Sequence, residues 1–233
     1  VSSGSGTQVV FQMNTNLWIN WYWTNQYLLT VSPGPNGSVN SNAVNGWYTN
    51  GVVPANITAS ADPTYSFFMW SGTGVPDGQD MDNPLSVTMT QARTLQANFA
   101  SSTPSTKQWT GTGLWESSGN WDPVGMPASW DYAIIRSGTV QLGYSRYART
   151  LVISNGATML FTNWTAKLTV SNVTVRSGAK ITLPGAFTTS QMSNRVNFVC
   201  TNFTLDAGGT IDADGKGWSF NNGPGAGNGG CAA

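Results

Sequence analysis

One short pattern recurs in the second half of the chain and limits what it can fold into. It reads apolar residue, any residue, apolar residue, two polar or small residues, glycine, and then a further apolar residue. Full copies occupy residues 151–159, 173–181 and 203–211, and a shortened copy occupies 133–140. The alternating apolar residues predict a short half-buried strand, and the glycine predicts a tight turn because it reaches positive φ without steric cost.

The spacing of the copies predicts how they assemble. They start 18, 22 and 30 residues apart, which is the size of one coil of a β-solenoid. A single coil cannot bury its own apolar stripe, so neighbouring coils must stack to stabilise one another. We therefore predict a short parallel β-solenoid over residues 131–220, followed by a glycine-rich tail at 221–233.

The charge content limits the partners that the chain can have. Charged residues make up 9% of the 233 residues and the formal net charge is zero, compared with roughly 25% charged residues in an average soluble domain. No attraction to nucleic acid is therefore expected. No apolar run approaches 18 residues, so we expect no membrane insertion. This composition suits a secreted or cell-surface β protein whose copies pack laterally with little repulsion.

The first half of the chain predicts a separate β-rich module at residues 26–99. Several segments alternate between apolar and polar residues, as expected for strands, and Pro- and Gly-rich turns separate them. No stretch has the periodicity and capping signals of a helix. The module carries five motifs in order: Gly46-Trp47-Tyr48, Ile57-Thr-Ala59, Tyr65-x-Phe67-x-x-Trp70-Ser-Gly72, Asn83-Pro84-Leu85-x-Val87-x-Met89 and Ala97-Asn98-Phe99.

These motifs resemble the divergent internalin-B-type B-repeat, a repeat of bacterial surface proteins that often occurs in tandem. The resemblance implies a small β-grasp-like module with a spacer or adhesive role, and it implies no catalytic residues. Residues 1–25 then correspond to the closing strands of a preceding repeat or to an exchangeable strand segment.

A linker and a cap are expected between the two units. Residues 100–107 are small and polar with one proline, which predicts a short linker. Residues 108–130 are rich in tryptophan and resemble the lead-in segment that covers the first coil of bacterial solenoid surface proteins. The coils that follow resemble the right-handed β-helices of autotransporter-like proteins. Such a cap is needed because the end of a solenoid exposes an apolar stripe and unpaired strand edges.

One loop contains candidate metal ligands. Asp77, Asp80 and Asp82 lie close together beside a glycine, and hard oxygens spaced in this way can bind calcium. The spacing and terminal glutamate of an EF-hand are absent, so a solvated loop is the alternative. No other cofactor is expected.

Aromatic and cysteine residues give two further hypotheses. Trp18, Trp21 and Trp164 are candidates for glycan stacking or for an interface, with burial in a core as the alternative for such aromatic segments. Cys200 and Cys231 can form a disulfide in an oxidising compartment, or Cys200 is a buried free thiol.

Catalysis is not expected. The chain has no histidine, so it lacks the commonest general base and the commonest transition-metal ligand. The carboxylates that a polysaccharide-degrading β-helix would need are scattered, at Asp131, Asp206, Asp212 and Asp214 along the coils and at Glu116 and Asp122 in the cap. No nucleophile elbow and no phosphate-binding loop appears.

Together these features predict an all-β, non-enzymatic, extracellular structural protein. We expect a segment or subunit of a bacterial cell-surface fibre or adhesive stalk, which self-associates as a homopolymer or contacts neighbouring repeats of the same protein. The alternative is a module that binds surface glycans, or a fragment of a polysaccharide-degrading β-helix enzyme.

Overall fold

The chain is all-β, as predicted. The computed structural model describes residues 23–40, 45–54, 56–188, 194–220 and 222–223. These residues form twenty strands in five sheets, and the one helical segment among them is the 3-10 turn Ser118–Asn120. No helix in the described ranges is long and apolar enough to cross a membrane.

The first unit is built on a four-stranded sheet in the order β3-β1-β6-β5. Its strands are β1 (Gln26–Pro33), β3 (Gly46–Thr49), β5 (Tyr65–Thr73) and β6 (Arg93–Ser101). The central pair, β1 and β6, is parallel, and both outer pairs are antiparallel. The first and last strands of the unit therefore lie side by side in the middle of the sheet, as a β-grasp-like module requires. Strands β2 (Gly37–Val39) and β4 (Ala59–Ala61) form a small separate sheet.

The alternating residues of the central strands supply the core of this unit. Leu29 and Val31 of β1 and Leu95 of β6 are buried, while the residues between them face outward or lie half-buried. Trp70 of β5 is fully buried, and its indole nitrogen donates a 2.8 Å hydrogen bond to the carbonyl oxygen of Asp82. This bond attaches the loop that contains the candidate calcium ligands to the core.

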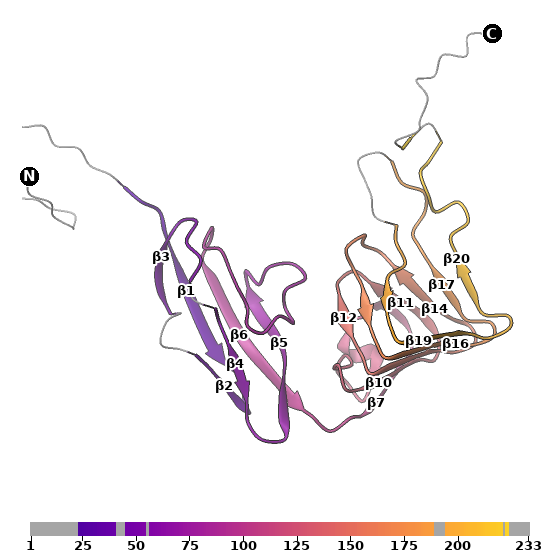
Figure 1. The fold of residues 1–233 in the computed structure, drawn as a ribbon, viewed down its shortest axis with the longest axis horizontal. Helices are drawn as coiled ribbons and strands as arrows, with labels where there is room; N and C mark the ends of the chain where they lie inside the picture. The colour runs from indigo at the N-terminus through magenta and orange to yellow at the C-terminus, as the bar shows by residue number, and fades with distance from the viewer. Residues whose placement is uncertain (1–22, 41–44, 55, 189–193, 221, 224–233) are drawn as a thin grey trace, which may run out of the picture.

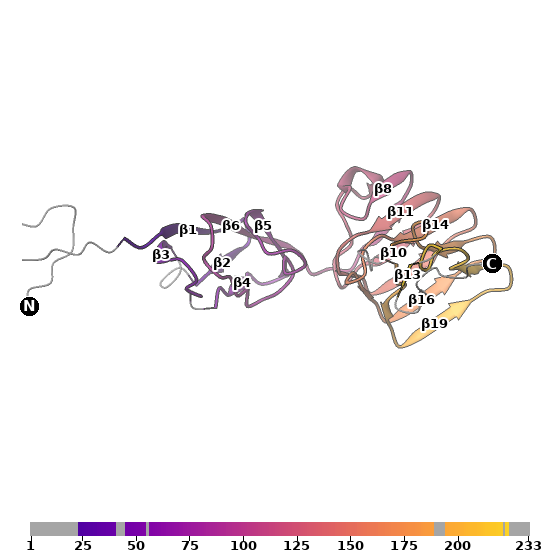
Figure 2. The same ribbon diagram turned by 90° about the horizontal axis from the view of Figure 1, so that it is seen from above.

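The second unit is a stack of parallel strands in three sheets, as the repeat pattern predicted. The six-stranded sheet contains, in order, β19 (Asn202–Leu205), β16 (Asn172–Val175), β13 (Thr150–Ile153), β10 (Tyr132–Ile135), β7 (Thr106–Trp109) and β9 (Trp121–Asp122). The five-stranded sheet contains β20 (Thr210–Asp212), β17 (Lys180–Thr182), β14 (Ala157–Phe161), β11 (Gly138–Leu142) and β8 (Thr112–Leu114). The three-stranded sheet contains β12 (Arg146–Tyr147), β15 (Leu168–Thr169) and β18 (Phe198–Val199). Figure 2 shows the coils stacked in sequence order from β10 to β19.

The register matches the repeated pattern residue by residue. Leu151 pairs with Ala133 on one side and Val173 on the other, and Val173 pairs with Phe203. The glycine of each copy has a positive φ, between 73° and 86°. The apolar positions of the copies at 133–140, 151–159 and 173–181 therefore stack above one another and form one continuous core.

The first coil begins earlier than the sequence indicated. Strands β7 and β8, which lie between Thr106 and Leu114, already pair in parallel with β10 and β11. The predicted linker at 100–107 is correspondingly shorter, because β6 ends at Ser101 and β7 starts at Thr106. The tryptophan-rich segment thus supplies strands of the stack as well as residues that close its end.

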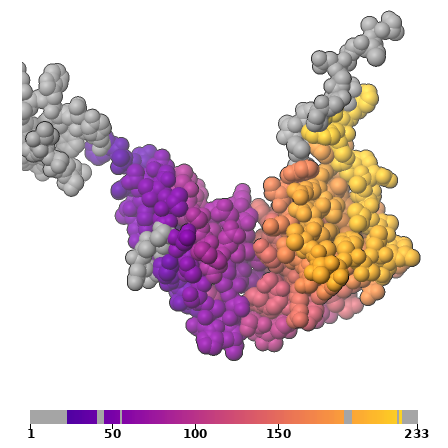
Figure 3. All heavy atoms as spheres, viewed as in Figure 1, coloured from indigo at the N-terminus to yellow at the C-terminus, as the bar shows by residue number. Residues whose placement is uncertain are grey.

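The two units lie side by side and are joined at one end by the connection from β6 to β7 (Figure 1). The space-filling view shows the first unit in contact with the second (Figure 3). The candidate sites are therefore of two kinds, at the ends of the solenoid and at the joint between the units.

Candidate functional site

The beginning of the solenoid is closed. Strand β9 turns back and pairs antiparallel with β7, which covers the outer edge of the six-stranded sheet. Trp121 packs edge-on against Trp109 and Trp115, with ring centroids 5.2 and 5.0 Å apart. The Trp121 indole nitrogen also donates a 2.8 Å hydrogen bond to the carbonyl oxygen of Trp115. All three rings are buried, so the apolar stripe is covered at this end.

The last coil is different, because its stripe is exposed. Phe203, Leu205 and Ile211 are 39%, 46% and 46% exposed. They occupy the same register positions as residues that are fully buried one coil earlier, namely Val173, Val175 and Ile181. Within the described part of the chain, the apolar stripe of the solenoid is therefore exposed to solvent at this end. It lies beside β19 and β20, the edge strands of their sheets.

Polar contacts reinforce the last two coils on their outer face. Arg176 pairs with Asp206 at 3.2 Å, and Lys180 pairs with Asp212 at 3.4 Å. A hydrogen bond from the Asp214 backbone to the Asp212 carboxylate, together with the Lys180 ammonium, lowers the pKa of Asp212 below its usual value. These pairs are partly exposed, and exposed ion pairs contribute little to stability.

The loop that carries the candidate calcium ligands points one of them at the solenoid. The Asp80 carboxylate accepts two hydrogen bonds from the Arg146 guanidinium, at 2.8 and 3.1 Å. Asp77 and Asp82 are exposed. No group of three acidic, histidine or cysteine side chains among the described residues is placed to hold a metal ion. Calcium binding by Asp80 would require its carboxylate to release the Arg146 guanidinium.

The sequence did not predict that Arg146 is buried between two carboxylates. It is 3% exposed and occupies an inward position of β12, in register with Leu168 and then Phe198 in the next coils. Its Nε donates a 2.5 Å hydrogen bond to Glu116. A charged residue aligned with apolar residues of the later coils would have indicated this burial. The alignment could not be made from the sequence, because β12 lies outside the repeated pattern.

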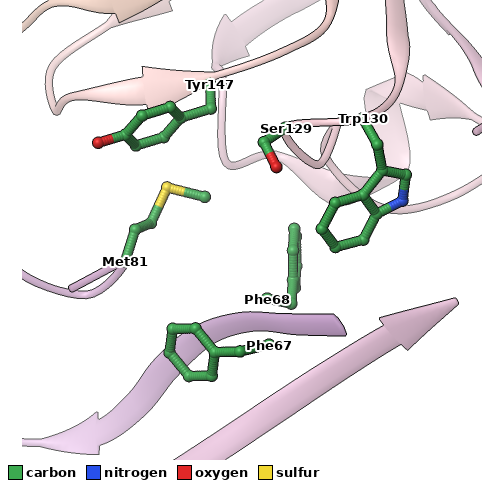
Figure 4. A pocket seen from close by; sticks show the side chains of 6 residues that line it. All are labelled: Phe67, Phe68, Met81, Ser129, Trp130 and Tyr147. Carbon is green, nitrogen blue, oxygen red and sulfur yellow. The ribbon is translucent and has the colours of Figure 1, made fainter. Parts of the chain in front are cut away.

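A shallow aromatic hollow lies beside this arginine, between the two units. It has a volume of about 180 Å³. Figure 4 shows Phe67, Phe68 and Met81 of the first unit facing Ser129, Trp130 and Tyr147 of the second. The hollow is therefore part of the contact between the units.

The aromatic and cysteine candidates are only partly placed. Trp164 is 37% exposed, and the Arg195 guanidinium lies 5.6 Å from its ring centre. Trp18, Trp21 and Cys231 lie outside the described residues. Cys200 is half-buried against the solenoid core, and the predicted disulfide stays a prediction.

Three of the candidate carboxylates, Asp131, Asp206 and Asp212, make separate structural contacts. Asp131 is buried and accepts hydrogen bonds from the backbone and hydroxyl of Ser105, at 2.8 and 2.9 Å, and from the Ala128 backbone. Asp206 and Asp212 each pair with a basic residue, as described above. That the chain is not an enzyme stays a prediction.

The comparisons with known proteins concern the first unit. Residues 27–103 match the family model of the divergent InlB B-repeat domain. The match supports the resemblance drawn from the five motifs, and we call this unit the B-repeat module. Repeats of this family occur in bacterial surface proteins, which points to an extracellular or cell-surface location. No curated protein and no solved structure matches the chain.

Proposed function

We propose that the chain is a non-enzymatic structural segment of a bacterial cell-surface fibre or adhesive stalk. The B-repeat module acts as a spacer, and the parallel stack, an autotransporter-like β-helix with a tryptophan-rich cap, acts as the part that assembles. Assembly uses burial of apolar surface and pairing of strand edges between copies or with neighbouring repeats.

The observation that carries this proposal is the difference between the two ends of the solenoid. The first coil is covered by β9 and three buried tryptophans. The last coil leaves Phe203, Leu205 and Ile211 exposed at positions that are core in every preceding full copy. An exposed apolar stripe beside open strand edges is a typical site for strand addition by another chain.

The chemistry of the sequence supports the same conclusion. A surface with few charges and no net charge provides little electrostatic repulsion between copies. We expect a second copy of the chain, or a neighbouring repeat of the same protein, to cover the stripe.

Light scattering at two protein concentrations, with negative-stain electron microscopy, tests the proposal. The wild-type chain should have a mass above its monomer value of 24.8 kDa, rising with concentration, and should form ordered assemblies. Leu205→Lys places a charge in the exposed stripe and should leave the chain monomeric, because a buried unpaired charge opposes association.

Val124→Lys is the matched control. Val124 is 75% exposed, and it follows β9 at the closed end of the solenoid. The same substitution there should leave assembly unchanged. Monodisperse wild-type chains at both concentrations, or assembly that Leu205→Lys does not affect, would contradict the proposal. Deleting residues 1–25 measures separately what the predicted exchangeable segment contributes.

A further inference from the structure

The connection between the two units is attached at both of its ends. The Ser102 backbone and hydroxyl both donate 3.0 Å hydrogen bonds to the carbonyl oxygen of Thr64 in the B-repeat module. Three residues later, Ser105 binds the buried carboxylate of Asp131 in the solenoid through its backbone and hydroxyl. Only two residues, Thr103 and Pro104, separate these anchors, so the connection leaves little length for independent movement of the units.

Strand β5 directs side chains to both units at once. A β-bulge between Phe67 and Met69 interrupts the alternation of the strand. Phe67 packs on the core of the B-repeat module, whereas Phe68 and Met69 pack against the solenoid core. Bulges commonly redirect side chains in this way. The contact between the units is therefore built into the strand and is partly apolar.

Arg146 adds an ion pair to the contact between the units. It belongs to the solenoid, and its guanidinium binds Glu116 of the solenoid and Asp80 of the B-repeat module. Asp80 is itself held in place, since its carbonyl oxygen accepts a 2.6 Å hydrogen bond from the backbone of Trp70. A guanidinium holds two carboxylates in fixed directions because its donors form a rigid planar fork. The Asp80 pair exists only when the two units touch.

We infer that the Arg146–Asp80 pair is a clasp that fixes the angle between the B-repeat module and the solenoid. With the pair formed, the anchored connection and the Phe68 contact make one rigid body of the two units. With the pair broken, the buried guanidinium lacks one of its two carboxylates, and the units hinge about Thr103 and Pro104. The clasp acts within a single chain and does not depend on self-association.

Small-angle X-ray scattering of Asp80 variants tests the clasp. Asp80→Asn removes the charge of the partner, and Asp80→Lys places a second positive charge against Arg146. Both should increase the radius of gyration and the maximum dimension relative to wild type, with the larger increase for lysine. The measurements are extrapolated to zero concentration, in the Leu205→Lys background if the wild type associates, so that assembly does not affect the result.

Asp77→Asn is the control, because it removes an equal charge from an exposed position in the same loop. Its scattering should superimpose on that of the wild type. Circular dichroism should be unchanged for all variants, since the Asp80 carboxylate lies outside both core clusters. If both Asp80 variants scatter as the wild type does, or if the wild type is already flexible, the clasp is overturned.

Discussion

At the scale of single residues, the glycine of each repeat has two different roles that the sequence cannot separate. The pattern predicted a positive φ at this position, and all four glycines have one. It did not predict which of them is also in close contact with another coil. A Cβ at Gly138 would overlap the carbonyl oxygen of Gly111, whereas a Cβ at Gly156 would meet no atom within 4 Å. Gly111 lies between β7 and β8 in the first coil, which carries no copy of the pattern, so the sequence does not predict this contact.

The pair Gly138→Ala and Gly156→Ala separates these roles. Gly156→Ala should lower the free energy of unfolding of the solenoid by about 1 kcal/mol, the cost of a left-handed conformation at alanine. Gly138→Ala should lower it by more than about 3 kcal/mol, because the backbone must also move away from Gly111. Chemical denaturation measures both values. Equal losses would show that the close approach to Gly111 has no effect on stability.

At the scale of elements, the sequence predicted the strands of the solenoid that repeat and missed the solenoid strands that do not. The full copies became β13 with β14, β16 with β17, and β19 with β20. The first coil was missed because β7 and β8 carry no alternating stripe. The core at this coil is instead formed by three tryptophans, Trp109, Trp115 and Trp121. Arg146 was missed for a related reason, since only the register of β12 with β15 shows that it occupies an apolar position.

A pair of isoleucines tests whether the last coil is uncovered in the single chain. Ile181 and Ile211 are partners in the same parallel ladder, but one is fully buried and the other is 46% exposed. Ile181→Ala should lower the free energy of unfolding by about 2–5 kcal/mol, and Ile211→Ala by less than about 1 kcal/mol, when the protein is dilute.

Thermal or chemical unfolding at low concentration gives both numbers. A loss at Ile211 as large as the loss at Ile181 would mean that the stripe is already covered within one chain. The open end would then be unavailable to a second copy.

At the scale of the whole molecule, the order of the units could be predicted from the sequence, but the contact between them could not. The five motifs identified the B-repeat module, and the match to residues 27–103 supports that identification. The contact between the units depends on a bulge in β5, a loop aspartate and an inward arginine. Each of these is an irregularity in a local pattern, and only the folded chain brings the three together.

The central claim is that the last coil of the solenoid is where copies of the chain meet. Hydrogen exchange measured across a range of protein concentrations tests this claim most directly, because it reports the protection of each strand separately. We expect amide exchange in β19 (Asn202–Leu205) to slow as the concentration rises, while exchange in β10 (Tyr132–Ile135) stays constant. Protection of β19 that does not depend on concentration, in a chain that self-associates, would contradict it and place the contact elsewhere.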